Sequence, residues 1–333
     1  MAKERLPNLP VLLLRKIYKT GQTRGADDDV IYQNRVARSS TVLIPYACWD
    51  SCSPSQGPES GYENGFIVLL SPSEYFGNSD IATDLAEKGL TIGSNALVFY
   101  ETREQWNANN PDRLRWRPAE RRTAPLGGKY VARIPATTAA ESGEKIIRGF
   151  HKTAMKGAGI RVYEYASTAT TEKCRHQLEA LFWLCFDSEK VAVSNGMTAG
   201  DARIRKKSVL QTCEQLGLLD MARLTRARVL NGDGATVCPL CLEELSGQGF
   251  FNRLTQAEGR GVPDLTVTEL NLFHIEGLRV GVLNHRPYNL GWGHHHCNVV
   301  VRDSGIQGTL AWMLTLINRN VKCGHLAVEN KDA

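Results

Sequence analysis

The hydrophobic positions in the first half of the chain fall in short runs that are rich in β-branched or aromatic residues. Gly, Pro, Ser or Asn bounds each run, a pattern that predicts β-strands rather than long helices. The runs cover residues 41–46, 65–70, 96–100, 130–134 and 159–165. We therefore expect a mixed sheet as the core of this half.

From residue 171 onward the apolar period becomes that of a helix. One helical face is marked by Leu178, Leu181, Phe182 and Cys185. Further helical stretches cover about residues 207–216 and continue, after a break at Gly217, to about residue 230. A closing amphipathic helix is predicted by a last set of residues at the same spacing: Ile306, Leu310, Met313 and Ile317.

A turn-rich link of Asn, Gly, Asp and Gly at residues 231–234 follows the helical stretches and is the predicted domain boundary. It divides the chain into residues 1–231 and 232–333. The net charge of +5 is divided unevenly, because the first part has 32 basic and 25 acidic residues and the second has 8 and 10. The positive charge is therefore concentrated in the first part.

Two clusters hold much of the basic excess. The first is interleaved with Trp116 and consists of Arg113, Arg115, Arg117, Arg121 and Arg122. The second consists of Arg203, Arg205, Lys206 and Lys207. Both could line a DNA backbone, where each neutralised phosphate adds affinity by counterion release. A solvated basic face is the alternative.

The composition, with 42% apolar and 23% charged residues, is that of a globular protein and excludes a disordered or fibrous chain. No run of about 18 uncharged apolar residues is present, so no membrane span is expected. Residues 1–15 lack the cleavage site of a secretory signal, so a cytoplasmic location is expected. In that reducing compartment the nine Cys predict metal ligands or buried thiols rather than disulfides.

Two pairs of potential metal ligands share one spacing. Cys238 and Cys241 form a C-x2-C pair, and His294 and Cys297 repeat that spacing downstream. Four ligands of the Cys3His type suit a tetrahedral structural zinc ion. Such an ion would stabilise the fold of a domain of about 100 residues. Either of the next two residues, His295 or His296, could replace His294. Buried thiols beside a solvated His turn are the alternative to a metal site.

An alternating strand at residues 269–275 lies between the two pairs and carries His274. Asn289 follows 15 residues later and Asn298 follows 24 residues later. This order resembles the HNH, or ββα-metal, nuclease superfamily. The segment from Asn289 to Asn298 is similar to the superfamily's N-L-x3-C-x2-C-N segment, with His294 in place of the first Cys. The resemblance covers about residues 236–303.

The resemblance implies how a phosphodiester bond would be hydrolysed. His274 would be the general base that takes a proton from water. Asn289 would hold the ring of His274 or the hairpin through its amide. Asn298 would place its amide oxygen on a single catalytic Mg²⁺ or a similar divalent ion. A core histidine with satisfied contacts is the alternative for His274.

One position departs from the superfamily pattern. The residue before the base is often an Asp, Glu or His that binds the metal, and here it is Phe273, which cannot. Four residues could supply the missing ligand: Glu269, Asn271, Glu276 and Asp303. Otherwise the ion rests on Asn298, water and substrate phosphate, or the domain is a degenerate nuclease that only binds DNA.

The loop between His274 and Asn289 contains side chains suited to a DNA backbone. Arg286 could clamp a phosphate and His285 could hydrogen-bond one. Both could equally be turn residues beside Pro287.

Together these features predict an α+β chain. It would have an N-terminal mixed α/β region for DNA recognition and dimerisation, followed by a zinc-stabilised ββα-metal (HNH) nuclease domain. The resemblance implies a type II restriction endonuclease, a homodimer that cuts both strands of a palindromic site in double-stranded DNA. A companion DNA methyltransferase is expected in the same cell.

Three alternatives stay open at this point. The first is a modification-dependent endonuclease, whose base-flipping pocket could be built by Tyr46, Trp49 and Tyr62. The second is a homing-type nuclease, which would act as a monomer on a long asymmetric site. The third is a zinc-stabilised DNA-binding protein without cleavage activity.

Overall fold

The computed structural model describes residues 6–18, 31, 36–54, 61–134, 146–150, 158–254, 268–279 and 281–327. The chain divides into two compact units. Unit 1 comprises Met1–Tyr18, Thr170–Arg279 and Asn284–Ala333, and unit 2 comprises Lys19–Ala169 and Val280–Leu283. The compact units thus divide near residue 169. The division predicted at residue 231 was between a DNA-recognition region and a nuclease domain. That assignment of functions to the two parts stays a prediction.

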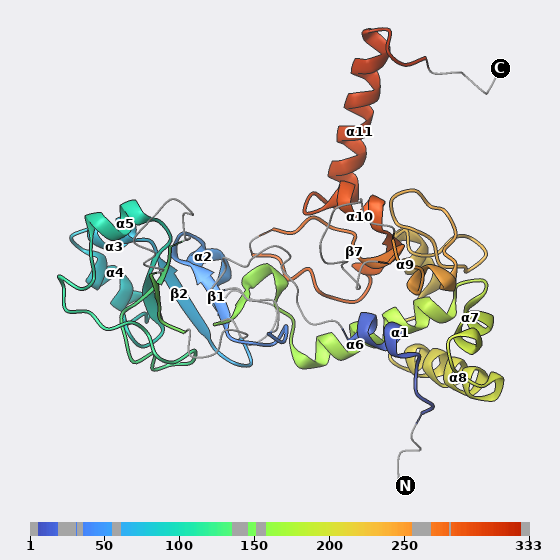
Figure 1. The fold of residues 1–333 in the computed structure, drawn as a ribbon, viewed down its shortest axis with the longest axis horizontal. Coiled ribbons are helices and arrows are strands. Elements are labelled where there is room, and N and C mark those ends of the chain that lie inside the picture. The colour runs from blue at the N-terminus through green and yellow to red at the C-terminus, as the bar shows by residue number, and fades with distance from the viewer. Residues whose placement is uncertain are drawn as a thin grey trace. The chain divides into compact units, whose positions relative to one another are not determined.

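Unit 2 is built on a six-stranded sheet with the strand order β5-β4-β3-β2-β1-β6 (Figure 1). The strands are β1 (Val42–Pro45), β2 (Phe66–Leu70), β3 (Ala96–Tyr100), β4 (Tyr130–Arg133), β5 (Ile147–Arg148) and β6 (Ile160–Arg161). Neighbouring strands are parallel except β4 and β5, which are antiparallel. Four of the strands predicted from the apolar runs are confirmed. In the fifth run, residues 159–165, only Ile160–Arg161 forms a strand and Val162–Glu164 forms a 3-10 helix. The two-residue β5 was not predicted.

Short helices occupy connections between the parallel strands. They are α2 (Trp49–Cys52), α3 (Pro72–Phe76), α4 (Ile81–Glu87) and α5 (Arg103–Ala108). Capping boxes begin α3 and α5. At α3 the Ser71 hydroxyl accepts a hydrogen bond from the Glu74 N–H, and the Glu74 carboxylate accepts one from the Ser71 N–H. Thr102 and Gln105 form the same pair of hydrogen bonds at α5. Local side-chain capping therefore begins these helices where no long apolar period marks them.

The sheet is buried on both faces. On one face Ile44 shares a core with Ile81 and Leu85 of α4. On the other face Leu43 shares a core with Leu126 from the connection before β4. Strands covered on both sides consist of continuous apolar runs rather than alternating ones, which is typical of parallel sheets.

The predicted fold class is wrong. The sheet of unit 2 is a predominantly parallel, Rossmann-like α/β arrangement, not the mixed sheet of an α+β chain that ends in a ββα-metal nuclease fold. Parallel strands require crossover connections, which usually contain a helix. The crossover helices here have only four to seven residues, too few to show a helical apolar period in the sequence.

Unit 1 is mainly helical, and helix α6 enters it at Thr170. Its helices are α1 (Val11–Ile17), α6 (Thr168–Trp183), α7 (Ser188–Ser194), α8 (Ala199–Gln215), α9 (Met221–Arg226), α10 (His295–Val301) and α11 (Gly305–Lys322). Two strands, β7 (Leu270–His274) and β8 (Leu290–His294), form an antiparallel ladder. Among the helices that the structure describes, none has both the length and the apolar character that a membrane crossing needs.

Aromatic residues join α6 to the ladder at the centre of unit 1. The rings of Phe182, Phe250 and Trp292 follow one another edge to face, with centroid separations of 5.2 and 4.9 Å. The indole N–H of Trp292 donates to the Leu178 carbonyl over 2.8 Å. Trp292 is fully buried, so this hydrogen bond satisfies its one polar group and fixes β8 against α6.

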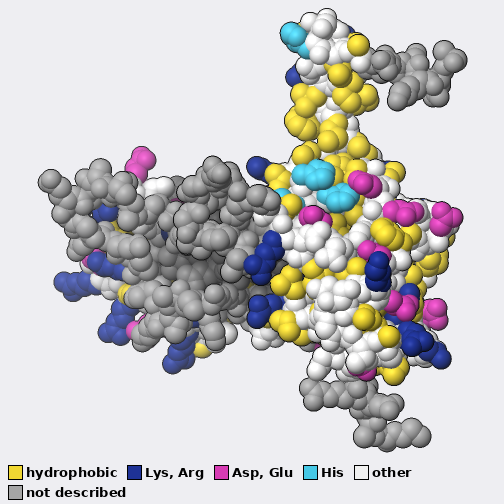
Figure 2. All heavy atoms as spheres, turned by 45° about the vertical axis from the view of Figure 1, so that its right-hand side comes forward, with side chains coloured by type: hydrophobic (Ala, Val, Ile, Leu, Met, Phe, Trp, Pro, Cys, Tyr) yellow, Lys and Arg dark blue, Asp and Glu magenta, His cyan; other side chains and the backbone are white. Residues whose placement is uncertain are grey.

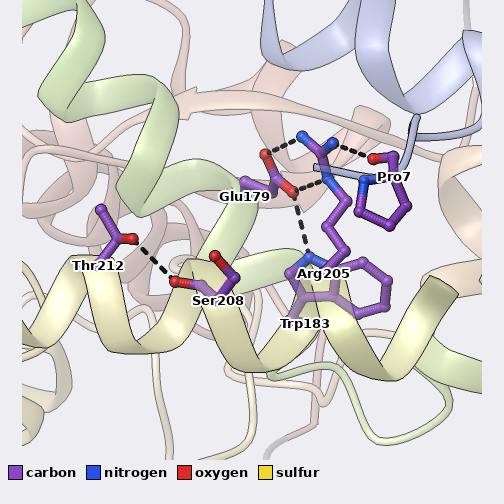
Figure 3. A network of polar contacts seen from close by, with 6 residues as sticks. All are labelled: Pro7, Glu179, Trp183, Arg205, Ser208 and Thr212. Atoms are coloured by element: carbon purple, nitrogen blue, oxygen red, sulfur yellow. Dashed lines mark hydrogen bonds and ion pairs between the residues drawn. The ribbon is translucent and has the colours of Figure 1, made fainter. Parts of the chain in front are cut away.

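A buried ion pair ties α6 to α8 (Figure 3). The side chains of Arg205 and Glu179 are only 11% and 6% exposed. The guanidinium donates to both Glu179 oxygens, over 2.6 and 3.0 Å, and to the Pro7 carbonyl. The indole N–H of Trp183 donates to the same carboxylate over 3.3 Å. Each charge is therefore compensated inside the core.

This arrangement corrects the interpretation of the second basic cluster as a DNA-backbone surface. Arg205 is committed to the buried pair, and Lys206 pairs with Glu189 over 2.8 Å. Arg203 and Lys207 are exposed on α8. Half of the cluster is therefore structural.

Removal of the Arg205 side chain would leave a buried, uncompensated carboxylate on Glu179. We expect Arg205→Ala to lower the free energy of unfolding by about 3–5 kcal/mol, measured by denaturant titration. Lys206→Ala breaks a half-exposed pair and should cost about 1 kcal/mol or less. An Arg205→Ala cost as small as that of Lys206→Ala would contradict the role given to the buried pair.

Candidate metal centre and active site

The loop that carries the first Cys pair closes on itself. Val237 forms a β-bridge with Glu244. Inside that bridge the Cys238 N–H donates to the Glu243 carbonyl over 2.9 Å, and the Leu242 N–H donates to the Cys238 carbonyl over 2.8 Å. Leu242 has a left-handed backbone with φ of +63°, which turns the chain back. The result is a tight knuckle around Cys238.

Arg228 holds this knuckle from outside. Its Nε donates to the Pro239 carbonyl over 2.8 Å, and a terminal nitrogen donates to the Leu240 carbonyl over 3.3 Å. Both acceptors lie between Cys238 and Cys241, so the arginine fixes the segment that spaces the two thiols. No motif in the sequence marks Arg228 for this role, because the contact depends on tertiary packing.

The structure brings the two predicted pairs together. The ligand atoms of Cys238, Cys241, His294 and Cys297 all lie within 4.8 Å of one another. The Cys241 Sγ is 3.4 Å from the His294 Nδ1. His294 ends β8, and Cys297 lies in the following helix α10. In the described part of the chain, this is the one group of three or more His, Cys, Asp or Glu side chains spaced to hold a single ion.

The two other histidines of this segment point to different neighbours. The Nδ1 of His295 is 3.2 Å from the Asn271 side-chain nitrogen. His296 is exposed, and its ring stacks on that of His294 with centroids 5.3 Å apart. Figure 2 shows histidine side chains gathered on the surface of unit 1 near the start of the projecting helix α11. Of the three histidines, His294 groups with the thiols.

Glycine at position 293 makes room for the cluster. A Cβ there would lie 2.6 Å from a ring carbon of Phe273 and 3.3 Å from the Cys238 sulfur. Phe273 is fully buried, so neither neighbour has space to retreat. A glycine inside a strand often marks such a close approach, so Gly293 is a signal in the sequence for this tight packing that the ligand spacing does not contain.

The electrostatics of the cluster favour a bound cation. Burial raises the pKa of the Cys297 thiol, and the neighbouring Cys238 and Cys241 raise it further. Burial also raises the pKa of Cys241 and lowers the pKa of His294, which keeps the imidazole neutral and able to ligate. A metal ion would relieve the repulsion among the thiolates, so the donor set fits one.

A second group of predicted residues surrounds the end of β7. His274 is the last residue of this strand, is half-buried, and pairs with Leu290 in the ladder. The backbone on either side of His274 is held by an asparagine amide. The Asn298 Nδ2 donates to the Leu272 carbonyl over 3.2 Å, and the Asn289 Oδ1 accepts from the Glu276 N–H over 2.9 Å. The three predicted residues thus attach to one short stretch of chain.

Asn289 acts on the loop that follows His274. Its side chain is almost fully buried, and its Nδ2 donates to the Asn284 carbonyl over 2.7 Å. The backbone carbonyl of Asn289 accepts from the Ile275 N–H over 3.1 Å. These contacts join the start and the end of the loop, so the described contacts of Asn289 hold the hairpin.

The predicted phosphate contacts lie in the same loop. His285 is buried, and its ring centroid is 6.0 Å from that of His274. Arg286 donates to both oxygens of Glu276 over 2.7 Å. The structure therefore places His285 beside His274, whereas Arg286 is engaged with a carboxylate and would have to exchange that partner for a phosphate.

Phe273 packs in the core against Gly293 and does not reach solvent. The candidates for a substitute ligand mostly have other partners. Both oxygens of Glu276 accept from Arg286. Glu269 accepts from the Asn252 amide, and Asn271 donates to the Thr268 carbonyl, while Asp303 is exposed. Among the described residues, the three acidic candidates, Glu269, Glu276 and Asp303, belong to no group of His, Cys, Asp or Glu spaced to hold one ion.

The first basic cluster lies in unit 2, in the loop between α5 and β4. Four of its members are exposed, namely Arg113, Arg115, Arg117 and Arg121, and Arg122 is half-buried. Arg115 and Arg117 line an open hollow of about 600 Å³ together with Trp116 and Lys129. Trp116 stacks on Phe76 at 5.5 Å, and the Lys129 ammonium lies 5.5 Å from its ring. Trp116 therefore holds its ring between the aromatic residue Phe76 and the Lys129 cation.

The aromatic residues considered for a base-flipping pocket belong instead to the core of unit 2. Trp49 is only 8% exposed and packs on Phe66 at 5.2 Å. The Tyr62 hydroxyl donates to the Cys52 carbonyl over 2.6 Å, and its ring meets Tyr165 edge to face at 5.0 Å. Tyr46 is half-buried beneath Lys88. These contacts are those of a packed cluster, so the residues do not form the suggested pocket.

Comparison with known protein families identifies the class as restriction endonucleases, which are hydrolases that cut DNA at specific sites. The chain belongs to the BstXI restriction endonuclease family, whose model matches residues 15–295. A solved structure described as a type II restriction endonuclease aligns with 46% of this chain at 14% identity and a TM-score of 0.25. The aligned part spans 56% of that other chain. A comparison with curated proteins found no match.

The Cys/His cluster makes a direct prediction about metal content. We expect the wild-type chain to retain about one metal ion, and Cys297→Ser to lose it and to unfold more easily, because the ion's binding energy stabilises the fold. Elemental analysis after desalting and a thermal melt measure both effects. Cys213→Ser is the matched control, since Cys213 is also buried but lies outside the cluster. Equal metal content in the two variants would contradict the site.

Proposed function

We propose that this chain is a type II restriction endonuclease of the HNH class, in which His274 is the general base and Asn298 a ligand of a catalytic Mg²⁺ or similar divalent ion. Restriction endonucleases generally use divalent metal ions. The proposal adds a separate structural zinc ion held by the Cys/His cluster. It rests on the residues around β7, not on the fold of the whole chain.

One observation carries the proposal: two asparagine amides hold the backbone on both sides of His274. Asn298 binds at Leu272, two residues before it, and Asn289 binds at Glu276, two residues after it. A proton acceptor that must meet a water molecule and a phosphate at fixed distances needs such a rigid mount. A surface histidine without a chemical role needs none.

The orientation of the Asn298 amide suits a metal ligand. Its nitrogen donates to the Leu272 carbonyl, which leaves its oxygen for another partner. Mg²⁺ takes oxygen ligands and usually keeps several waters, so one amide oxygen together with water and substrate phosphate suffices. When bound, the ion would neutralise charge on the phosphate and the leaving oxygen. Phe273 is buried in the core and cannot bind the ion. Ion binding through Asn298, water and phosphate uses no second protein ligand and is therefore compatible with phenylalanine at this position.

Each residue of the proposed site then has a defined role. The ring of His274 takes a proton from the attacking water. Asn289 keeps the following loop closed, and His285 within that loop lies beside the base. Arg286 would leave Glu276 and donate to a phosphate oxygen when DNA binds. The metal cluster at the other end of the ladder holds β8 and α10 in place.

Zinc is the proposed occupant of the Cys/His cluster because three thiolates and one neutral imidazole are its usual structural ligands. Mg²⁺ prefers oxygen and would not compete for these sulfur atoms. The chemistry of the ligands is therefore sufficient to direct zinc to the Cys/His cluster and Mg²⁺ to the site at Asn298.

The basic loop of unit 2 is the proposed contact with the DNA backbone. Arg115, Arg117 and Lys129 bring three positive charges to one hollow, and no acidic side chain is among the described residues that line it. Exposed members Arg113 and Arg121 extend the same loop, which also contains Arg122. Such contacts add affinity for any sequence, because each neutralised phosphate releases counterions.

The proposal extends to the partners of the enzyme. Each chain carries one proposed active site, so cutting both strands of double-stranded DNA calls for a homodimer, and a palindromic site matches its two-fold axis. A restriction enzyme acts where host DNA must be protected. A cytoplasmic location and a companion DNA methyltransferase in the same cell are therefore part of the proposal.

Cleavage of unmodified plasmid DNA in the presence of Mg²⁺ tests the function. We expect discrete fragments from the wild-type chain, and a rate about 10²- to 10⁴-fold lower for His274→Ala, because a positioned base contributes that much to proton transfer. Zinc content should be unchanged in this variant. His325→Ala is the matched control, since His325 is exposed and lies outside the site.

The same experiment separates the alternatives. Full activity in His274→Ala would overturn the assignment of the base. Cleavage confined to methylated plasmid would replace the proposal by a modification-dependent enzyme, and a monomer that cuts one long asymmetric site would indicate a homing-type nuclease. DNA binding without any cleavage would leave a zinc-stabilised DNA-binding protein.

The contact assigned to the basic loop is tested by the salt dependence of DNA binding, measured without Mg²⁺. Neutralising Arg115 and Arg117 together should weaken binding and lower the slope of log affinity against log salt by about 2, since each phosphate contact contributes about 0.9. The control is Arg203→Ala with Lys207→Ala, which removes two exposed charges from α8. Equal slopes for the two double variants would remove the basic loop from the interface.

A further inference from the structure

Helix α11 starts in the core of unit 1 and then leaves it (Figure 1). Ile306 and Thr309 in its first turns are buried. Leu310 and Met313 still pack partly against the core. The helix continues to Lys322 and, with 18 residues, is about 27 Å long. The second half of the helix, from Leu314 to Lys322, therefore contributes no residue to the core among the described residues of unit 1.

The projecting part nevertheless carries large apolar side chains. Leu314 is 60% exposed, Ile317 is 43% exposed and Val321 is 40% exposed. Together with Leu310 they recur at intervals of four, three and four residues, which is the spacing of the contact positions in paired helices. We call these four residues the α11 stripe. Figure 2 shows hydrophobic side chains along the helix as it projects from unit 1.

An isolated helix of this length is only marginally stable in water, so most helices depend on packing of an apolar face. An exposed stripe of this kind marks an interaction surface. We infer that the stripe pairs with the same stripe of a second copy of this chain and is the dimer contact of the enzyme. This inference rests on the proposed function, because two cuts by chains with one active site each call for two chains.

The charge pattern of α11 fits an identical partner. No charged residue occurs from Ser304 to Asn318, so two copies bring no like charges together along these turns. Arg319 and Lys322 lie beyond them, in the last turn. DNA or a strongly charged protein would find no complementary charge on this stretch. A second copy of this chain, in contrast, presents the same apolar stripe. In a two-fold contact the same surface of both copies meets, so apolar side chains face apolar side chains.

The available area is consistent with a reversible dimer. The exposed apolar side chains of the stripe offer on the order of 300 Å² per copy, and Trp312 adds nothing because helical periodicity places it on the opposite face. Two copies would then bury about 600 Å² in total along the stripe, which is in the range of weak, transient interfaces. We therefore expect association in the micromolar range rather than a permanent dimer.

Sedimentation or light scattering of the full-length chain over a range of concentrations tests the inference. The wild-type chain should reach twice its mass of 36.9 kDa as the concentration rises through the micromolar range. Leu314→Glu with Ile317→Glu should raise the dissociation constant about 100-fold or more, because it places carboxylates in the contact. Both side chains are largely exposed, so the circular dichroism spectrum and melting temperature of the monomer should be unchanged.

The matched control adds the same two charges elsewhere on the helix. Ala311 and Thr315 are exposed and, by helical periodicity, lie away from the α11 stripe. Ala311→Glu with Thr315→Glu should leave the dissociation constant within a few-fold of wild type. A wild-type chain that stays monomeric would overturn the inference. A dimer that survives in Leu314→Glu with Ile317→Glu would also overturn it, since another surface would then hold the copies together.

Cleavage products give a second, independent readout. On a plasmid with one site, the stripe variant should accumulate nicked circles at concentrations where the wild-type chain gives linear DNA directly. A wild-type chain that dimerises through the stripe but cuts no DNA would reject the proposed function and keep the contact. A monomeric chain that still cuts both strands together would reject the contact and keep the function.

Discussion

The five residue pairs of the β7–β8 ladder set the distance between the two chemical centres of unit 1. His294 of the Cys/His cluster pairs with Leu270 at one end of the ladder, and His274 pairs with Leu290 at the other. Because each strand advances by about 3.3 Å per residue, the two histidines stay at opposite ends of a short rigid element. Trp292, in the middle of β8, anchors this element to α6 through a buried hydrogen bond. The proposed chemistry depends on that ladder more than on any single side chain.

The chain combines this ladder with a second unit of a different architecture. Unit 2 is a parallel α/β sheet that is buried on both faces, and it carries the basic loop. Unit 1 contains the metal cluster, the proposed base and the projecting helix α11. In the proposed enzyme, DNA affinity, catalysis and dimerisation thus use separate surfaces. The charge division seen in the sequence falls at residue 231, inside unit 1, so it does not coincide with the division between the units near residue 169.

Sequence patterns predicted most local elements but not their assembly. The positions of the strands and of the closing helix could be predicted because the spacing of apolar residues is a local property of the sequence. The predicted fold class was wrong because the short crossover helices show no helical spacing of apolar residues in the sequence. Spacing alone grouped Cys238 with Cys297, since two pairs of matched ligands suit one ion. The same logic failed for Arg205 and missed Arg228. Their partners, Glu179 and the Pro239 carbonyl, are brought near only by tertiary packing.

The central claim is that His274 takes a proton from water during DNA cleavage. The most direct test is the single-turnover cleavage rate of His274→Ala, measured with and without added imidazole. A vacated base position can accept a free imidazole, so we predict a slow rate that rises in proportion to imidazole concentration, while the rate of the wild-type chain does not change. Cleavage by His274→Ala at the wild-type rate without imidazole, with the metal content intact, would contradict the account.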